Sequence, residues 1–138
     1  MTIEIQGPST LLQVFDMPAA VRFYRDVLGF AIANRSPTYA IKAGVELFHW
    51  AMLRRPGAEV MLNTAYDEGE RPATPERPRV AAHGDTILYF HCPDLDAAYA
   101  HMQEHGVTCV HHSTARYGMR QLSFRDPDGY GIVLQHPV

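Results

Sequence analysis

The sequence predicts an α+β protein built from two tandem βαβββ modules, because one strand–helix–strand pattern occurs twice in the same order. Asp16 and Asp94, 78 residues apart, each follow an apolar strand and precede apolar residues at helical spacing. The segments 56–62 and 128–134, 72 residues apart, each combine a turn with an alternating strand. The agreement of order, caps and turns indicates a duplicated unit.

The first half begins with a short strand at 11–15. Asp16 then caps a helix, and Pro18 occupies an early helical position where proline is tolerated. Apolar residues at helical spacing continue to Leu28, and Gly29 stops the helix. The strands that complete this half are expected at 30–33, 46–53 and 59–63.

The second half repeats this order after a proline-rich segment. Residues 67–84 contain three prolines and almost no large apolar side chain, so we expect a linker there. The linker separates a first module at 1–66 from a second at 85–138, and together they are expected to form one compact domain. The elements expected in the second module are a strand at 86–92, a helix from Asp94 to Gly106, and strands at 107–110, 120–125 and 131–135.

A sheet with a helix on one side divides its side chains by parity, because successive strand residues point to opposite faces. Leu12, Val14, Val60 and Leu62 are expected beneath the first helix. The other face carries a mixture of amide, carboxylate, imidazole, aromatic and apolar groups, which suits a partly enclosed pocket. This mixture includes Leu11, Gln13, Glu59, Met61, Asn63, Ile87, Tyr89, His91, Val133 and Gln135.

The overall charge and the cysteine content exclude several classes of partner. The formal net charge is −3 and the pI is near 6.2, so neither nucleic acid nor an anionic membrane is expected as a partner. Cys92 and Cys109 form neither a C-x-x-C pair nor a disulfide framework. No signal-peptide pattern and no run of about 18 apolar residues occurs, so we expect a cytoplasmic protein without a membrane span.

Residues 11–30 resemble the opening signature of the vicinal-oxygen-chelate superfamily, which includes glyoxalases, bleomycin-resistance proteins and extradiol dioxygenases. The resemblance spans about residues 9–136. It implies that the two modules form one cup-shaped mixed sheet, the glyoxalase/bleomycin-resistance fold, in a homodimer. The most specific matching segments are Phe23–Tyr24, Leu28–Phe30 and, for the closing signature, Asp126–Gly129.

In metal-dependent members of that superfamily, four His, Gln or Glu ligands bind a divalent ion in the cup. The positions that match these ligands here hold Ser9, Met61, Ile87 and Val133. Serine binds divalent transition metals poorly, methionine prefers soft ions, and the other two side chains have no donor atom. We therefore expect no metal and no other cofactor. A displaced metal site would need other donors, and the candidates are His91, Glu59, Gln13, Gln135 and His49.

The function that we favour is a metal-free binding protein, similar to the bleomycin-resistance branch, that sequesters a small aromatic or antibiotic-like molecule in the cup. Aromatic side chains stack on flat ligands, and ring faces or carboxylates attract cations. Large aromatics are also the residues most often buried for packing, so each one could instead belong to the core. The residues expected to contact the ligand are Gln13, Phe48, Trp50, Glu59, Met61, Tyr89, His91 and Phe124.

Two alternatives remain open. The first is an enzyme of the same superfamily, a lyase, isomerase or dioxygenase, that uses the displaced metal site or metal-free acid–base chemistry. Glu59 or His91 would then act as the base, and Arg120 would anchor an anionic substrate or, alternatively, form a structural ion pair. The second alternative is a dimeric interaction module that binds no small ligand.

Overall fold

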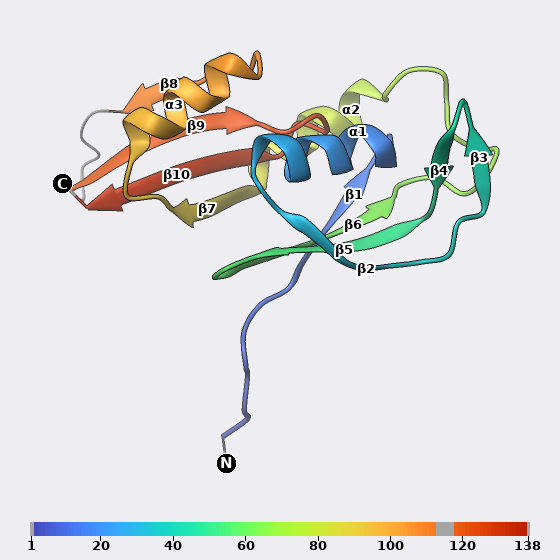
Figure 1. Cartoon of the computed structure of the whole chain (residues 1–138), viewed down its shortest axis with the longest axis horizontal. Coiled ribbons are helices and arrows are strands. Elements are labelled where there is room, and N and C mark those ends of the chain that lie inside the picture. The colour runs from blue at the N-terminus through green and yellow to red at the C-terminus, as the bar shows by residue number, and fades with distance from the viewer. Residues whose placement is uncertain (1, 113–117, 138) are drawn as a thin grey trace. The chain divides into compact units, whose positions relative to one another are not determined.

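The computed structural model describes residues 2–112 and 118–137, and the chain divides into two compact units, Met1–Glu70 and Arg71–Val138. Each unit contains a four-stranded mixed sheet with a helix packed on one face (Figure 1). The strand order β1-β6-β5-β2 in the first unit corresponds to β7-β10-β9-β8 in the second. The predicted fold class, two tandem βαβββ modules, is therefore confirmed.

The first unit begins with β1, and Asp16 then caps α1 by accepting a hydrogen bond from the backbone N–H of Ala19 at 3.2 Å. Gly29, with φ +78°, ends the helical segment as predicted. The elements of this unit are β1 (Thr10–Val14), α1 (Met17–Arg22), the π-helical turn η1 (Phe23–Val27), β2 (Ala31–Arg35), β3 (Ala40–Lys42), β4 (Val45–Leu47), β5 (Trp50–Arg55) and β6 (Ala58–Thr64).

The second unit repeats the strand, the capped helix and the closing hairpin. Asp94 caps its longer helix by accepting a hydrogen bond from the backbone N–H of Ala97 at 3.0 Å. The elements of this unit are α2 (Arg77–Ala82), the 3-10 turn η2 (His83–Asp85), β7 (Ile87–His91), α3 (Leu95–Glu104), β8 (Val110–His112), β9 (Met119–Arg125) and β10 (Gly131–Pro137).

The strand registers support the duplication residue by residue. In the first sheet β1 is parallel to β6, with Leu11 opposite Met61. In the second sheet β7 is parallel to β10, with Tyr89 opposite Val133. These two pairs are related by the offsets of 78 and 72 residues that the sequence shows. The two halves therefore share their strand pairing as well as their order of elements.

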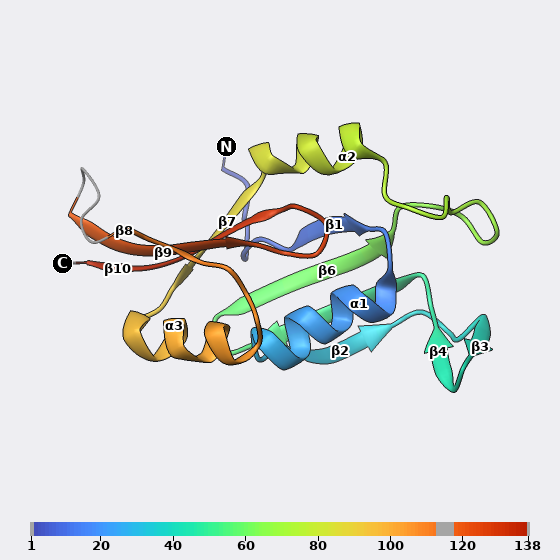
Figure 2. The ribbon, with the colours of Figure 1, turned by 90° about the horizontal axis from the view of Figure 1, so that it is seen from above.

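The core of the first unit lies between its sheet and α1 (Figure 2). Leu12, Val14, Val60 and Leu62 are at most 1% exposed, as the parity argument predicts. Full burial of an aliphatic side chain of this size contributes about 1.5–3 kcal/mol. Tyr24, also fully buried, extends this core beneath the helical segment. The side chains on the opposite face of this sheet, which points away from α1, do not belong to this core.

The strand expected at 46–53 is in fact two strands, so that prediction was wrong. Ala43 and Gly44, with φ +50° and +77°, form a tight turn that closes the β3–β4 hairpin. The chain then bends before Trp50, where β5 begins and pairs with β2 and β6. Apolar periodicity alone did not reveal this interruption, because the bend is held by a hydrogen-bonding side chain from a distant part of the chain, Ser36.

The strand expected at 107–110 begins later, at Val110. Helix α3 ends in a Schellman motif around Gly106, whose φ is +70°. In this motif the backbone N–H of Val107 donates to the Met102 carbonyl at 2.9 Å. Because that N–H is committed to the helix end, Val107 does not enter the sheet.

The proline-rich segment expected to be a linker contains α2 and η2. Pro78 lies in the first turn of α2, where its missing N–H leaves no hydrogen bond unmade. The segment also approaches the turn between β9 and β10, since a Cβ atom placed on Gly129 would lie 2.9 Å from Val80. The chain following Arg71 is therefore part of the second compact unit.

No helix in the described part of the chain has both the length and the apolar character that crossing a membrane requires.

The contact between α2 and the β9–β10 turn generates a stability prediction with an internal control. Gly129→Ala should destabilise the protein by about 1–3 kcal/mol more than Gly57→Ala, because overpacking is added to the backbone strain. Both glycines have positive φ, +87° and +80°, but only Gly129 has neighbouring atoms within 4 Å of the added Cβ. Urea unfolding of the two variants measures the difference. Equal destabilisation would contradict the contact.

Candidate functional site

The face of the first sheet that points away from α1 carries side chains in rows across the strands. We call it the open face. The strand register defines it, because residues directly opposite each other in a sheet point to the same side. Its residues are Leu11, Gln13, Ala31, Asn34, Trp50, Met52, Arg54, Glu59, Met61 and Asn63.

The middle row of the open face is mainly apolar. Leu11 lies opposite Met61, and Met61 lies opposite Met52. Leu11 is 46% exposed, while both methionines are half-buried. Flexible thioether side chains adapt to irregular apolar surfaces and make favourable contacts with aromatic rings. This row is therefore suited to the face of a flat apolar molecule.

A second row combines two amides with the chain's only tryptophan. Asn63 lies between Gln13 and Trp50 in the register, and its Nδ2 donates to the Gln13 Oε1 at 3.2 Å. The amides offer hydrogen-bonding groups at the edge of the apolar row, and the indole offers an aromatic surface. This combination of a few polar groups beside apolar and aromatic ones is typical of small-molecule sites.

The third row is charged, and its charges are paired. Arg54 lies opposite Glu59, with 2.6 Å between its Nε and the Glu59 Oε1. A hydrogen bond from the Ser9 hydroxyl lowers the pKa of Glu59 below its ordinary value, and the hydrogen bond from Arg54 lowers it further. Glu59 is thus held as a carboxylate, a poor arrangement for a general base acting near neutral pH.

Trp50 is held in place by a side chain from the end of β2. The Ser36 hydroxyl oxygen accepts hydrogen bonds from the backbone N–H groups of His49 and Trp50, each at 3.0 Å. The backbone N–H of Ser36 in turn donates to the Trp50 carbonyl at 3.0 Å. We call these three hydrogen bonds the Ser36 bracket. The bracket fixes the bend that precedes β5 and so sets the position of the Trp50 indole on the sheet.

Two of the expected site residues, Phe48 and His49, are occupied elsewhere. Phe48 is buried, with the Arg35 guanidinium 4.6 Å from its ring centroid, so it is a packing residue and not part of a ligand surface. His49 lies 3.1 Å from the Thr64 hydroxyl through Nδ1 and stacks on Tyr39. Neither residue lies in a row of the open face.

The second sheet has a corresponding face that includes Tyr89 and His91, both exposed. Beside them the Gln121 Nε2 donates to the Gln135 Oε1 at 3.0 Å. In the register, Gln135 corresponds to Asn63 and Gln121 to Trp50. An amide row is therefore present in both units.

Phe124 and Arg120 lie on the opposite side of this second sheet, toward α3. Phe124 is directly opposite the fully buried Ile132, and is itself 5% exposed, so its expected role in ligand contact is replaced by a role in the core. Arg120 has the same parity, and its Nη2 lies 3.7 Å from Asp96 at the start of α3. The structural ion pair that the sequence left open is therefore the arrangement observed.

The residues at the superfamily's metal positions do not fit a metal. The Ser9 hydroxyl donates to Glu59, Met61 belongs to the apolar row, Ile87 is an exposed aliphatic residue and Val133 is a buried one. The displaced donors Glu59 and His49 are engaged as described above. Within residues 2–112 and 118–137, no three His, Cys, Asp or Glu side chains converge in a way that could hold a metal ion.

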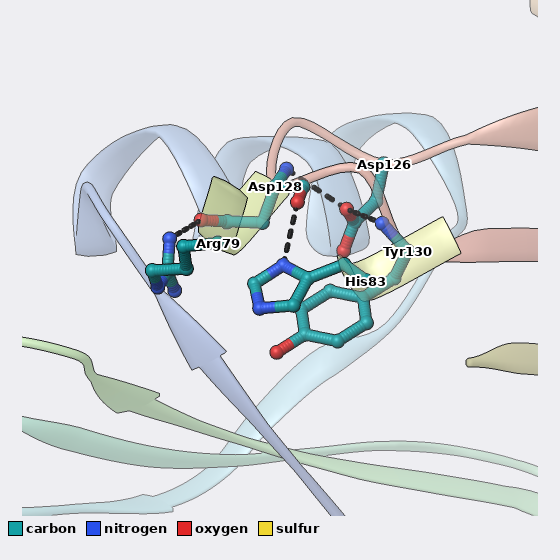
Figure 3. Close-up of polar contacts among 5 residues, drawn as sticks. All are labelled: Arg79, His83, Asp126, Asp128 and Tyr130. Atoms are coloured by element: carbon teal, nitrogen blue, oxygen red, sulfur yellow. Dashed lines mark hydrogen bonds and ion pairs between the residues drawn. The ribbon is translucent and has the colours of Figure 1, made fainter. Parts of the chain in front are cut away.

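A second polar cluster lies at the β9–β10 turn (Figure 3). The Asp126 Oδ1 accepts hydrogen bonds from the backbone N–H groups of Asp128 and Tyr130, at 2.8 and 3.0 Å. His83 donates from Nδ1 to the Asp128 carbonyl at 2.7 Å, and its ring stacks on Tyr130 with 4.0 Å between centroids. Arg79 Nη1 lies 3.4 Å from the Asp128 carboxylate.

This cluster anchors α2 and η2 to the β9–β10 turn. The imidazole of His83 binds a main-chain carbonyl, and the carboxylate of Asp126 binds main-chain N–H groups. Their polar capacity is therefore used to hold the turn and the helix together. The Asp-Pro-Asp-Gly signature, which the sequence identified as a turn, is the part of the cluster that could be foreseen.

The sequence prediction omits Met52 and Arg54 of the open face, the open-face residues Ala31 and Asn34 of β2, and the positioning residue Ser36. Alternation from Trp50 along β5 would have identified the first two, but the strand was expected to begin earlier and to end at 53. No local pattern identifies Ser36, because its partners lie 13 and 14 residues further along the chain.

Comparison with known sequences gives a match over nearly the whole chain. Residues 8–134 match the family described as the Glyoxalase/Bleomycin resistance protein/Dioxygenase superfamily. The chain is also 32% identical over 123 residues to the uncharacterized protein YaeR of Escherichia coli (strain K12), an alignment that covers 86% of each protein.

Solved structures agree with the sequence match. TnmS3, an antibiotic binding protein from Streptomyces sp. CB03234, superposes with a TM-score of 0.66 at 25% identity, covering 100% of this chain and 99% of that one. A lactoylglutathione lyase from Agrobacterium tumefaciens gives a TM-score of 0.66 at 18% identity, covering 96% and 94%. The second likeness concerns the fold alone.

Removal of the Ser36 hydroxyl should disturb Trp50. Ser36→Ala leaves two backbone N–H groups without their acceptor, which we expect to cost about 1–3 kcal/mol of unfolding free energy and to shift the tryptophan emission maximum. Urea unfolding and the fluorescence spectrum of the folded protein measure these effects. Thr108→Ala, at an exposed position, is the control and should leave both unchanged. An unchanged spectrum for Ser36→Ala would argue against the bracket.

Proposed function

Because the chain belongs to the Glyoxalase/Bleomycin resistance protein/Dioxygenase superfamily, we propose that it is a binding protein that sequesters a flat aromatic, antibiotic-like molecule without a metal ion. The ligand lies against the open face of the first sheet. Its ring system covers Leu11, Met52 and Met61, and Trp50 stacks on it or borders it. The amides of Gln13 and Asn63 recognise polar groups at its edge.

The observation that carries this proposal is the apolar row at the superfamily's metal position. Met61 stands where a metal-dependent member has a ligand, and its neighbours across the strands are Leu11 and Met52. Exposed apolar side chains on a strand face, flanked by amides and an indole, gain free energy when a flat ligand removes them from water, at about 25 cal/mol per Å². An ion would gain nothing from this row.

Two further points support binding over catalysis. TnmS3, similar over its whole length, is an antibiotic binding protein. The candidate base Glu59 has a lowered pKa and a bound arginine, and the candidate anion anchor Arg120 lies on the helix side of its sheet. A reaction requiring a base of raised pKa and a convergent anion site is not favoured by this arrangement.

The corresponding face of the second sheet carries Tyr89 and His91, both exposed, which offer a phenol ring and an imidazole for contact with an aromatic molecule. We expect the protein to be a homodimer, as the superfamily resemblance implies. Metal and cofactor play no part in this proposal.

Ligand binding can be followed through Trp50, because the chain has a single tryptophan. Naphthamide, an uncharged bicyclic probe, should quench its emission saturably. Met61→Lys should weaken the affinity about tenfold or more, because it places a charge within the apolar row. Ile41→Lys, a change at a residue 65% exposed in β3, is the matched control and should have no effect. Absence of saturable quenching, or equal effects of the two lysines, would refute this site.

Metal removal should leave binding intact. Dialysis against a chelator is expected to change the naphthamide affinity by less than about twofold, since none of the proposed contacts uses an ion. Elemental analysis of the purified protein should find far less than one transition-metal ion per chain. A stoichiometric ion whose removal abolishes binding would overturn the metal-free reading and favour the enzyme alternative.

A further inference from the structure

The open face has a simple charge balance. Of its ten residues, all within the described part of the chain, only Arg54 and Glu59 are charged, and they bind each other with 2.6 Å between Nε and Oε1. The face therefore presents one cation and one anion that neutralise each other. Its remaining side chains are amides, methionines, a leucine, an alanine and an indole.

The Glu59 carboxylate is already well satisfied. It accepts a hydrogen bond from Arg54 and another from Ser9, and its pKa is lowered as a result. Its side chain is 23% exposed, less than that of Arg54 at 59%. A cationic ligand would have to compete with a guanidinium that is already in contact, so its net electrostatic gain is small.

The same reasoning applies to an anionic ligand. Arg54 donates its Nε hydrogen bond to Glu59, so an anion placed beside it also meets the carboxylate. A charged ligand of either sign would lose hydration on entering an apolar row without gaining an unshared partner. An uncharged ligand neither loses the hydration of a charge nor needs an ionic partner on the face.

The second unit shows what the same row becomes without the carboxylate. Gly131 occupies the position that corresponds to Glu59, and Arg125 lies opposite it. Arg125 Nη1 donates to the Gly129 carbonyl at 2.9 Å. In both units the arginine of this row is thus bound to an acceptor within its own unit, and in the first unit alone that acceptor is a charged side chain.

We propose that the Arg54–Glu59 ion pair is a specificity determinant that makes the site select uncharged planar aromatic ligands over cationic or anionic analogues of the same shape. This inference rests on the proposed function, because it concerns the charge of the ligand that the open face binds. The ion pair disfavours charged ligands. Arg54 and Glu59 both remain charged, but each is already bound to the other and cannot form a new ion pair with the ligand without losing this contact.

Three probes with one ring system test the inference at pH 7: naphthamide, which is neutral, naphthoate, an anion, and naphthylmethylammonium, a cation. Calorimetric titration of the full chain should show naphthamide binding at least about tenfold more tightly than either ion. Glu59→Gln releases Arg54 and should shift the ratio of naphthoate to naphthamide affinity about tenfold toward naphthoate. Arg54→Gln releases Glu59 and should instead strengthen the binding of the cation, naphthylmethylammonium.

The chain supplies matched controls. Arg25 and Asp26 form a similar exposed pair, with 2.8 Å between Nε and Oδ1, in the helical segment and not on the open face. Asp26→Asn and Arg25→Gln change the net charge by the same amount as the test substitutions and should leave all three affinities unchanged. Surface pairs of this kind contribute little to stability, so all four variants should fold.

The outcomes separate the two proposals. If naphthamide binds but the ions bind as tightly, or if Glu59→Gln and Asp26→Asn act alike, the ion pair does not set selectivity and only this inference fails. If none of the three probes binds the unmodified protein, the proposed function fails and the inference fails with it. Tighter binding of naphthamide, with opposite gains for the two open-face variants, supports both.

Discussion

The two-residue alternation of the central strands is the constraint on which the rest of the structure depends. In β6, Met61 lies between Val60 and Leu62, both fully buried beneath α1. A one-residue slip of this strand would move the apolar core into solvent and the open face into the core. The side chains of the open face are therefore fixed by the same hydrogen bonds that fix the core, which gives the open face a rigid support.

The parts of the fold that depend on short-range signals were predictable from the sequence. The caps at Asp16 and Asp94, the glycine that ends each helix and the duplicated order of strands all follow from local chemistry. The face assignments of Leu12 and Val14 also held, because β1 is short and its parity is set by the helix that follows it. Parity also identified Met61 as a residue of the open face.

The errors came from contacts between distant segments. Phe124 was assigned to the ligand surface, but its parity depends on pairing with Ile132, and pairing register is a tertiary property. Phe48 was placed within a strand, whereas the Ser36 bracket bends the chain there and buries the ring under Arg35. In both cases an aromatic residue with the composition of a ligand contact was already used for packing, which is the more common use of large aromatics.

The two units share one scheme of strand pairing, but the polar groups at equivalent positions make different contacts in each unit. In the second unit Arg125 binds the β9–β10 turn, in which Asp126 holds the backbone and Asp128 binds Arg79 of α2. In the first unit a Cβ atom on Gly57 of the equivalent turn would meet no atom within 4 Å, and Arg54 pairs with Glu59 on the open face. On the open face the one cation and the one anion neutralise each other. Under the proposed function, such a face would hold a ligand through apolar contact and hydrogen bonding, and the ion pair would disfavour charged analogues.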